Sequence, residues 1–279
     1  MGPVVAVVSA GNMGAAIARR LTGHGLEVLT TLEGRSATSR ARSAEAGMKA
    51  VSTDELVGAD FLLSVLPPSA ALPFAREMAP RLVDAGTKPL FVDCNAVSPA
   101  TVRDIGSVVT ATGALFVDAC IIGAPPQPGR DGPRFYASGE GATPFQALAE
   151  YGLDIRVLDG PVGAASALKM SFAGINKGLA AIASAMILAA TRAGAADALR
   201  RELEESWPAL ATALTRQVPD MLPKAYRWVA EMQEIAEFSG EDTAARHIYL
   251  GAAELYDRIA RDVANSGAEA AVLSGFFGR

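Results

Sequence analysis

Histidine and cysteine are scarce in this chain of 279 residues, which contains two of each. His24 and His247 lie far apart in the sequence, so they do not predict a zinc site. Cys94 and Cys120 each follow an apolar, strand-like run, a setting that suits reduced, buried thiols better than a disulfide. We therefore expect no bound metal and no disulfide.

Long apolar runs and a targeting segment are also lacking. The longest apolar runs, such as residues 179–190, are shorter than the roughly 18 to 20 residues that cross a bilayer. The first strand-like run, Val4–Val8, is preceded by no basic flank and no small-residue cleavage site. We therefore expect a cytoplasmic protein that does not engage a membrane.

An excess of positive charge is absent too, because the formal net charge is -5. This charge argues against nucleic acid as the main partner, although a local basic cluster can still bind an anionic small molecule. Half of the residues are hydrophobic, and the length is sufficient for two domains, each with its own core.

Strand-like and helical patterns alternate along the first 160 residues. Strands are predicted at Val4–Val8, Glu27–Leu32, Lys49–Val51, Phe61–Leu66, Leu90–Asp93, Leu115–Ala119, Phe135–Ser138 and Ile155–Leu158. Because most of these runs are continuously apolar, they predict a parallel sheet with both faces covered. The fold class is therefore α/β, with a doubly wound parallel sheet.

Strand signals cease after Asp159, and only helical patterns follow, with breaks predicted near Gly194, at Trp207, at Pro219–Pro223 and at Ser239. We place the domain boundary at about residue 160. Residues 1–160 are predicted to form the sheet domain, and residues 161–279 an all-helical domain for substrate binding and dimerisation. A homodimer is expected because the helix over residues 179–190 is apolar nearly all round.

The turn between the first strand and the first helix carries Ser9, followed by Ala10, Gly11, Asn12, Met13 and Gly14. It lies where a GxGxxG sequence would bind the pyrophosphate of a dinucleotide, with Ser9 in place of the first glycine. A compact strand-to-helix connection is the alternative. The position of the turn at the head of the alternating pattern favours dinucleotide binding.

The end of the second strand carries the candidates for distinguishing NAD from NADP, namely Glu33, Gly34, Arg35, Ser36 and Arg40. An acidic residue at this place binds the ribose 2′-hydroxyl of NAD, whereas an arginine accommodates the 2′-phosphate of NADP. Glu33 leaves the choice open, and the basic and hydroxyl side chains favour NADP. Alternatively, the arginines only solubilise an exposed helix start.

Two further loops follow the fourth and fifth strands and are expected to border the nicotinamide half of the cofactor. Their cofactor-binding candidates are Leu66, Pro67, Pro68 and Asn95, and Ser98 is a candidate for substrate binding. Ser98 followed by Pro99 is equally typical of a helix N-terminus, and both interpretations can hold together.

Lys169 stands among small and apolar residues on the first long helix after the strand region. Asn176 lies seven residues later and returns to within about 20° of Lys169 around the helix, so the two share one face. Lys169 can be a snorkelling lysine, and Asn176 can be a packing residue. Beside a nucleotide-binding sheet, a buried lysine with a lowered pKa can instead donate or accept a proton.

These motifs together resemble the 6-phosphogluconate dehydrogenase-like, or β-hydroxyacid dehydrogenase, superfamily. The resemblance rests on the segments AGNMG, SVLPP, NAVSP, VDACIIGAPP and GAASALKMSFAGINKG, and the helical C-terminal part is similar to a poorly characterised branch. It implies a Rossmann-type domain, an NAD(P)-dependent oxidoreductase and Lys169 as the catalytic proton shuttle.

The departures from the family pattern concern the substrate side. Cys120, Ile121 and Ile122 replace the usual Pro-Val-Ser before Gly123, Ala173 stands where the family often has Asn, and Asn176 replaces the second acid of the sugar-phosphate enzymes. The resemblance assigns substrate contacts to Ser98, Cys120, Ile121, Ile122, Gly123, Phe172 and Ala173. An apolar pocket follows, and sugar-phosphate oxidation is disfavoured.

The leading interpretation is an NADP-dependent oxidoreductase acting on a small carbonyl/alcohol pair similar to a β-hydroxyacid, with Lys169 and Asn176 as catalytic residues. An imine reductase is the alternative among enzymes, because related proteins reduce C=N bonds. A non-catalytic NADP-binding protein is the alternative outside them.

Overall fold

The computed structural model describes residues 2–8, 11–127 and 132–278. The chain divides into two compact units, residues 1–169 and 170–279. The division falls later than the predicted boundary at residue 160, because it lies inside the long helix α6 (Ala164–Arg192). The two units are described separately below.

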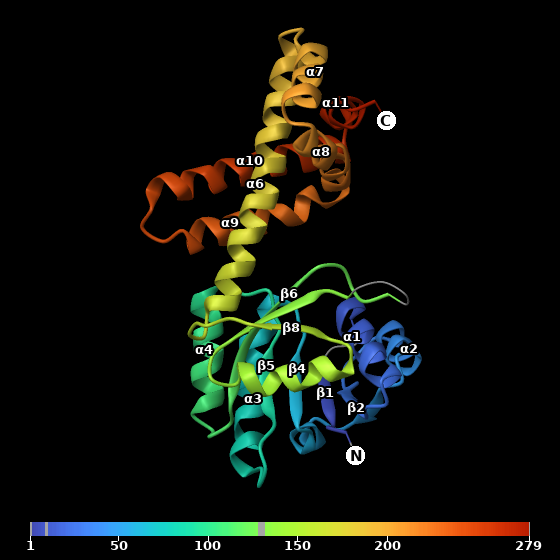
Figure 1. The fold of residues 1–279 in the computed structure, drawn as a ribbon, viewed down its shortest axis with the longest axis vertical. Helices are drawn as coiled ribbons and strands as arrows, with labels where there is room; N and C mark the ends of the chain where they lie inside the picture. Colours follow the sequence, from blue (N-terminus) through green and yellow to red (C-terminus); the bar gives the residue numbers. More distant parts are fainter. Residues whose placement is uncertain (1, 9–10, 128–131, 279) are drawn as a thin grey trace. The chain divides into compact units, whose positions relative to one another are not determined.

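The first unit contains an eight-stranded sheet in the order β3-β2-β1-β4-β5-β6-β7-β8 (Figure 1). Its strands are β1 (Val5–Val8), β2 (Val28–Thr31), β3 (Lys49–Val51), β4 (Phe61–Ser64), β5 (Leu90–Asp93), β6 (Phe116–Ile122), β7 (Arg134–Ser138) and β8 (Asp154–Val157). Neighbouring strands are parallel except for β6 and β7. This arrangement agrees with the predicted doubly wound α/β fold.

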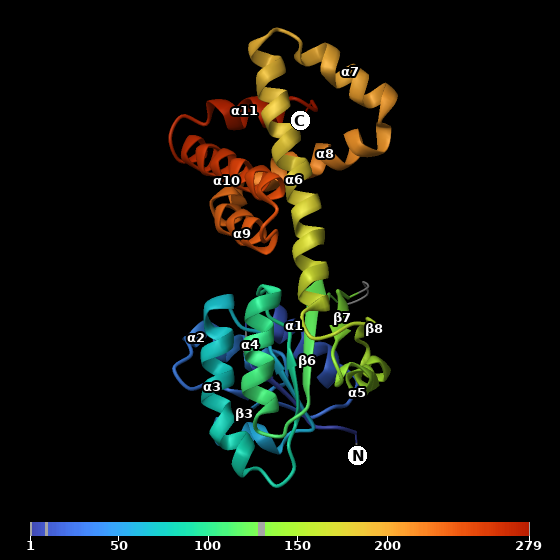
Figure 2. The same ribbon diagram turned by 90° about the vertical axis from the view of Figure 1, so that its left-hand side faces the viewer.

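Helices cover both faces of this sheet, as Figure 2 shows for α3 and α4 on one side and α5 on the other. The helices of the first unit are α1 (Asn12–Gly23), α2 (Ala37–Glu45), η1 (Asp54–Gly58), α3 (Pro68–Asp84), α4 (Pro99–Thr110), α5 (Ala142–Phe145) and η2 (Gln146–Tyr151). Successive strand side chains enter opposite cores: Val5 and Val7 pack with α1, whereas Ala6 and Val8 pack with α3 and α4. Burial on both faces explains the continuous apolar runs.

Two local features differ from the expectations. Cys120, Ile121 and Ile122 belong to β6, where they pair with Tyr136, Phe135 and Arg134 of β7, and are therefore strand residues, not part of a loop. The predicted strand ended at Ala119, because a local pattern does not reveal the antiparallel partner that extends it. Residues 142–151, which were not predicted as helix, form α5 and η2.

The second unit is all helical among its described residues. It contains the remainder of α6 with α7 (Ala196–Ser206), α8 (Pro208–Met221), η3 (Leu222–Lys224), α9 (Ala225–Phe238), α10 (Thr243–Ala264) and α11 (Ala268–Gly275). α9 and α10 run side by side (Figure 1). Tyr256 lies at the centre of the core, where its hydroxyl donates a 2.5 Å hydrogen bond to the Lys177 carbonyl oxygen.

The break predicted at Pro219–Pro223 is confirmed, because α8 ends at Met221 and η3 separates it from α9. The turn between α10 and α11 was not predicted. There Gly267 has φ +67, and its N–H donates to the Asp262 carbonyl oxygen at 2.8 Å. This left-handed glycine lies three residues after the end of α10 and is the N-cap of α11.

α6 is long and apolar enough, by length and composition alone, to cross a membrane, and among the described helices it alone meets this criterion. The expectation counted uninterrupted apolar runs. It therefore overlooked this helix, which is apolar on average although single polar residues such as Asn176 interrupt its apolar runs. In the structure 39% of the apolar stretch is buried. Since core helices of soluble proteins meet the same criterion, this is weak support for a membrane span.

Candidate functional site

The carboxyl ends of β1, β2, β4, β5 and β6 meet at one edge of the sheet, because these strands are parallel neighbours. The chain leaves β1 on one side toward β2 and β3 and returns on the other side at β4. In open α/β sheets, this topological switch point forms the crevice in which ligands bind. Most of the predicted site residues of the first unit follow these strand ends.

The turn after β1 is suited to an anion. Gly11 is the N-cap of α1, and no acidic side chain stands in the first turn, which contains Asn12 and Met13. The first amides of a helix lack intrahelical acceptors and lie at the positive end of its dipole. Gly14 is buried one turn into the helix, and Ala10 lies outside the described residues. This geometry fits the pyrophosphate of a dinucleotide.

The segment after β2 brings Glu33 and Arg40 together at a hollow of about 390 Å³. The Glu33 carboxylate accepts a 3.2 Å hydrogen bond from the Thr53 hydroxyl. The Arg40 Nε donates to the Arg35 carbonyl oxygen at 3.2 Å. The hollow therefore has a fixed carboxylate and a guanidinium on its wall, the two kinds of group that distinguish a ribose hydroxyl from a ribose phosphate.

The other nucleotide-selecting candidates take part in the local backbone structure. Gly34 has φ +66, which a glycine adopts without strain, and allows the chain to turn from β2 toward α2. Ser36 is the N-cap of α2 and accepts a 3.2 Å hydrogen bond from the Ser39 amide. Arg35 is half-buried, and the described lining of the hollow contains neither Arg35 nor Ser36.

Asn95 joins the loops that follow β4 and β5. The side-chain oxygen Oδ1 of Asn95 accepts a 2.5 Å hydrogen bond from the Leu66 backbone amide. Its side-chain nitrogen Nδ2 donates to the Ser64 hydroxyl at 2.9 Å and to the Asp93 carboxylate at 2.8 Å. Asn95 is buried, whereas Pro67 and Pro68, at the start of α3, are exposed. Asn95 therefore fixes the loop that presents the two prolines.

The Asp93 carboxylate also accepts a 2.9 Å hydrogen bond from the Asn95 backbone amide. Burial raises the pKa of the Asp93 carboxyl to about 6, while these hydrogen bonds from Asn95 lower it. Neither Asp93 nor Ser64 was predicted from the sequence as a site residue. An aspartate and a serine at the ends of apolar strands are the signal that could have identified this network.

On the substrate side, Ser98 caps α4 by accepting a 3.2 Å hydrogen bond from the Thr101 amide. Cys120 and Ile122 lie on the same face of β6, since alternate strand residues point the same way. Ile121 points to the opposite face and packs in the core with α1. Gly123 follows with φ +130, and a Cβ atom there would lie 3.1 Å from the Pro133 backbone.

Asp118 anchors the first turn of α6 to β6. The side chain is fully buried, and its Oδ2 accepts hydrogen bonds from the Gly163 amide at 2.8 Å and the Ser166 amide at 3.1 Å. The Ser166 hydroxyl donates to Oδ1 at 2.8 Å, and the Ser138 hydroxyl donates to Oδ2 at 3.1 Å. A carboxylate at this position is also stabilised by the positive, N-terminal end of the helix dipole. This anchor was not predicted from the sequence.

Lys169 lies one turn after Ser166, at the end of the first unit. Burial lowers the pKa of its amine below the ordinary value, whereas the thiols of Cys120 and Cys94 act in the opposite direction. Burial also raises the pKa of the Cys120 thiol to about 11. The arrangement therefore places an amine with a lowered pKa beside two neutral thiols, near the carboxyl end of β6.

The remaining site candidates belong to the second unit. Phe172 is exposed, and Ala173 packs on the edge of the helical core. Asn176 accepts hydrogen bonds from Gln217 at both its side-chain and backbone oxygens. Lys177 forms an ion pair with Glu231 and lies 5.1 Å from the centre of the Trp228 ring. Asn176 is thus held by α8, which the sequence did not indicate.

Among the described residues, no group of three or more His, Cys, Asp or Glu side chains could hold a metal ion. The first unit carries the N-terminus of α1 after β1, the hollow beside Glu33 and Arg40 after β2, and the buried Lys169 amine near the end of β6. These features fit a dinucleotide together with a proton donor or acceptor.

Comparison with known proteins identifies two segments. Residues 4–150 match the model of the NAD binding domain of 6-phosphogluconate dehydrogenase, and residues 190–259 match a domain of unknown function, DUF1932. A protein of Methanothermus fervidus, described as an uncharacterized 28.5 kDa protein in the 7S RNA 5′ region, is 31% identical over 183 residues. Those residues cover 65% of this chain and 68% of that protein.

Solved structures show the same fold. A conserved protein of unknown function, described as structurally similar to 3-hydroxyacid dehydrogenases, has a TM-score of 0.79 at 29% identity and covers 95% of this chain and 99% of its own. The 3-hydroxyisobutyrate dehydrogenase of Mycobacterium tuberculosis has a TM-score of 0.68 at 22% identity, covering 99% and 98%.

An imine reductase of Myxococcus stipitatus, solved with NADP+, has a TM-score of 0.55 at 20% identity, covering 98% and 99% of the two chains. A variant of that enzyme was solved with NAD+. With the nucleotide-domain match covering more than half of its length, this chain belongs to the 6-phosphogluconate dehydrogenase-like family and carries a DUF1932 C-terminal domain.

Proposed function

We propose that this protein is an NADP-dependent oxidoreductase that interconverts a small carbonyl compound and the corresponding alcohol, with Lys169 as the proton shuttle. The observation that carries the proposal is the buried Lys169 amine, whose pKa is lowered by burial, at the carboxyl end of a dinucleotide-type sheet. Bound NADPH would supply the hydride.

Lys169 suits this role because hydride addition to a carbonyl leaves negative charge on the oxygen. A protonated amine within hydrogen-bond reach stabilises that oxygen and then donates a proton to it. A lowered pKa makes the proton easier to release, and in the reverse direction the neutral amine accepts the proton of the alcohol. Asp118 and Ser166 hold the first turn of α6, so the amine is presented from a fixed backbone.

The amides of Gly11, Asn12 and Met13 would hold the pyrophosphate, and Leu66, Pro67 and Pro68 would border the nicotinamide. We assign Arg35 and Arg40 to the 2′-phosphate, which favours NADP over NAD. Arg40 lines the hollow beside Glu33, and Arg35 is bound to Arg40 through its carbonyl oxygen. The Glu33 carboxylate already accepts a hydrogen bond from the Thr53 hydroxyl. This supports assigning the 2′-phosphate to the arginines.

The substrate proposed is less polar than a sugar phosphate. Cys120 and Ile122 share the face of β6 that adjoins Lys169, and neither supplies a hydrogen bond to a carboxylate as a serine does. This apolar face also supports the second candidate, reduction of a cyclic imine. Retention of a lysine in place of another proton donor favours the carbonyl substrate.

The proposed assembly is a homodimer formed through the helical unit. Five apolar side chains on α6 are between 43% and 64% exposed, and they follow one another at intervals of three and four residues: Phe172, Ile175, Leu179, Ile182 and Met186. This spacing places them on one stripe of the helix. A groove of about 420 Å³ between α6 and α10 adjoins the stripe and can receive a helix of a second copy.

A cytoplasmic location is part of the proposal, since Cys94 and Cys120 are both free and buried. No role is proposed for nucleic acid or for a membrane surface.

The decisive experiment compares wild type with Lys169→Ala in two assays. NADPH oxidation over aldehydes, keto acids and cyclic imines measures turnover, and fluorescence titration measures NADPH binding. We expect the variant to lose turnover with NADPH affinity within about twofold of wild type. A normal kcat would contradict the role of Lys169. NADPH binding without turnover on any substrate class, by wild type itself, would instead favour a non-catalytic NADP-binding protein.

A further inference from the structure

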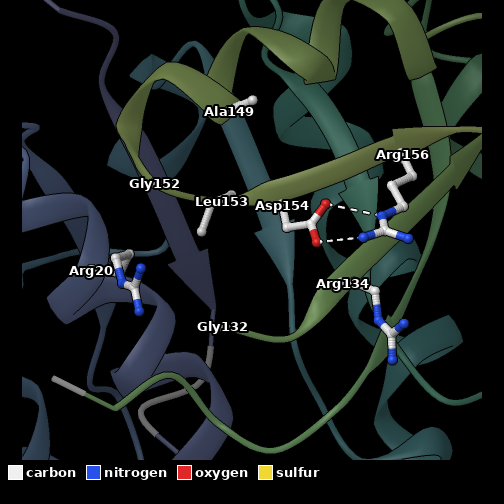
Figure 3. A pocket seen from close by; sticks show the side chains of 8 residues that line it. All are labelled: Arg20, Gly132, Arg134, Ala149, Gly152, Leu153, Asp154 and Arg156. Carbon is white, nitrogen blue, oxygen red and sulfur yellow. Dashed lines mark hydrogen bonds and ion pairs between the residues drawn. The ribbon is translucent and has the colours of Figure 1, made fainter. Parts of the chain in front are cut away.

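A second polar cavity lies in the first unit, and its described lining contains none of the proposed cofactor and substrate residues (Figure 3). Its volume is about 550 Å³, within the range of small-molecule sites. It is lined by Arg20, Gly132, Arg134, Ala149, Gly152, Leu153, Asp154 and Arg156. Among the described residues, three guanidinium groups, from α1, β7 and β8, and one carboxylate thus line one space.

The arginines approach the cavity from opposite sides. Figure 3 shows Arg20 on one side and Arg134 and Arg156 on the other, with Asp154 between them. Asp154 binds Arg156 through two hydrogen bonds, from Nε to Oδ1 at 3.0 Å and from Nη2 to Oδ2 at 2.9 Å. The Arg156 guanidinium also lies 5.7 Å from the centre of the Tyr136 ring. Arg156 is therefore oriented before any ligand arrives.

Gly152 keeps the wall beside Arg20 open. Its φ is +86, and a Cβ atom there would lie 2.6 Å from the His24 ring and 3.1 Å from the Arg20 Cδ. His24 in turn donates from Nδ1 to the Arg20 carbonyl oxygen at 2.8 Å. A side chain at position 152 would push against both residues, so the glycine preserves the position of Arg20.

Charge and shape together indicate the ligand. The described lining contains three arginines and one aspartate, and Asp154 is paired with Arg156. Guanidinium groups bind phosphate and carboxylate oxygens through paired hydrogen bonds. We propose that this cavity binds a small organic anion of the phosphate monoester class, as an effector separate from cofactor and substrate.

The cavity is distinct from the dinucleotide turn, although α1 contributes to both. Arg20 lies eight residues after Asn12, which corresponds to roughly 12 Å along a helix. The site stands on the β7–β8 side of the sheet, whereas the strand ends around β1 and β4 carry the proposed cofactor residues. The proposal therefore does not depend on the hydride chemistry.

Calorimetric titration at constant ionic strength tests the site, with glycerol 3-phosphate as the probe and glycerol as its uncharged counterpart. The full-length protein is used with saturating NADP+, so that a phosphate cannot enter the cofactor turn. We expect binding of glycerol 3-phosphate only. Arg134→Ala and Arg156→Ala should each weaken it about tenfold, through loss of a charge-assisted contact.

Asp154→Asn gives an effect of the opposite sign, because it removes the competing carboxylate and should tighten binding several-fold. Arg246→Ala, on the exposed surface of α10, is the matched control for loss of one positive charge and should leave binding within twofold. Circular dichroism of each variant verifies that the fold is intact. Absence of binding up to ~10 mM, equal weakening in Arg246→Ala, or unchanged binding in a folded Arg134→Ala protein would each overturn the proposal.

Discussion

Replacing Asp118 by alanine tests whether the sheet holds the helix that carries Lys169. The carboxylate is fully buried and receives four hydrogen bonds, two of them from the backbone amides of Gly163 and Ser166. In Asp118→Ala these two N–H groups lose their acceptor in a buried setting. A buried unsatisfied group costs about 1–3 kcal/mol, so the pair should cost about 2–6 kcal/mol of unfolding free energy.

Asp118→Asn is the informative intermediate. Its amide oxygen can still accept from the two backbone N–H groups, and its amino group can donate to the Ser166 hydroxyl after that hydroxyl rotates. The hydrogen bonds lose the contribution of the negative charge, and we expect a loss of about 1–2 kcal/mol. Asp84→Ala, at the exposed end of α3, is the control and should change stability by less than about 0.5 kcal/mol.

Urea unfolding followed by circular dichroism measures these changes, and NADPH oxidation measures their effect on turnover. If the anchor positions Lys169, both Asp118 variants lower kcat more than they weaken NADPH binding. A loss below about 1 kcal/mol in Asp118→Ala would show that the two amides find other acceptors, and the argument for the anchor would then be wrong.

Three further predictions follow from other sites. The pKa of Asp93 is raised to about 6 by burial, so its stabilising contribution is fully present below the unfolded pKa and is lost as the pH rises through 6. Relative to Asp93→Asn, wild type should lose about 2 kcal/mol of unfolding free energy between pH 4 and 7.5, and parallel urea-unfolding profiles would contradict this. Arg35→Ala should weaken NADPH at least tenfold more than NADH in binding titrations, whereas equal losses would remove the 2′-phosphate role. Ile182→Glu should convert the dimer to a monomer in light scattering, with Val83→Glu, exposed on α3, as control; a wild-type protein that is monomeric at micromolar concentration would disprove the dimer.

Local sequence patterns were sufficient to predict most of the sheet and the turn after β1. Apolar runs identified every strand of the described sheet within a few residues. The inner strands β1, β2, β4 and β5 show no polar alternation because both of their faces are buried. Glycines identified the turn after β1. These patterns could not reveal the antiparallel pairing of β6 with β7, which extends β6 to Ile122.

The polar networks required the fold. Asp118 and Ser166 are 48 positions apart, and their interaction exists only because α6 returns to the end of β6. The same is true of Asn95 and Ser64, and of the three arginines around the second cavity. An aspartate inside an apolar strand run does indicate that a partner must exist, since a buried charge needs compensation. It does not indicate which residue that partner is.

The two edges of the sheet are poor templates for another strand. β3 offers only three residues, Lys49–Val51, and Lys49 forms an ion pair there with Glu27 at 2.9 Å. β8 offers four, and two of them, Asp154 and Arg156, are charged and exposed. Short, charged edges oppose the backbone pairing that begins sheet-to-sheet aggregation. The apolar inner strands of the sheet are therefore flanked by two edge strands that oppose pairing with another sheet.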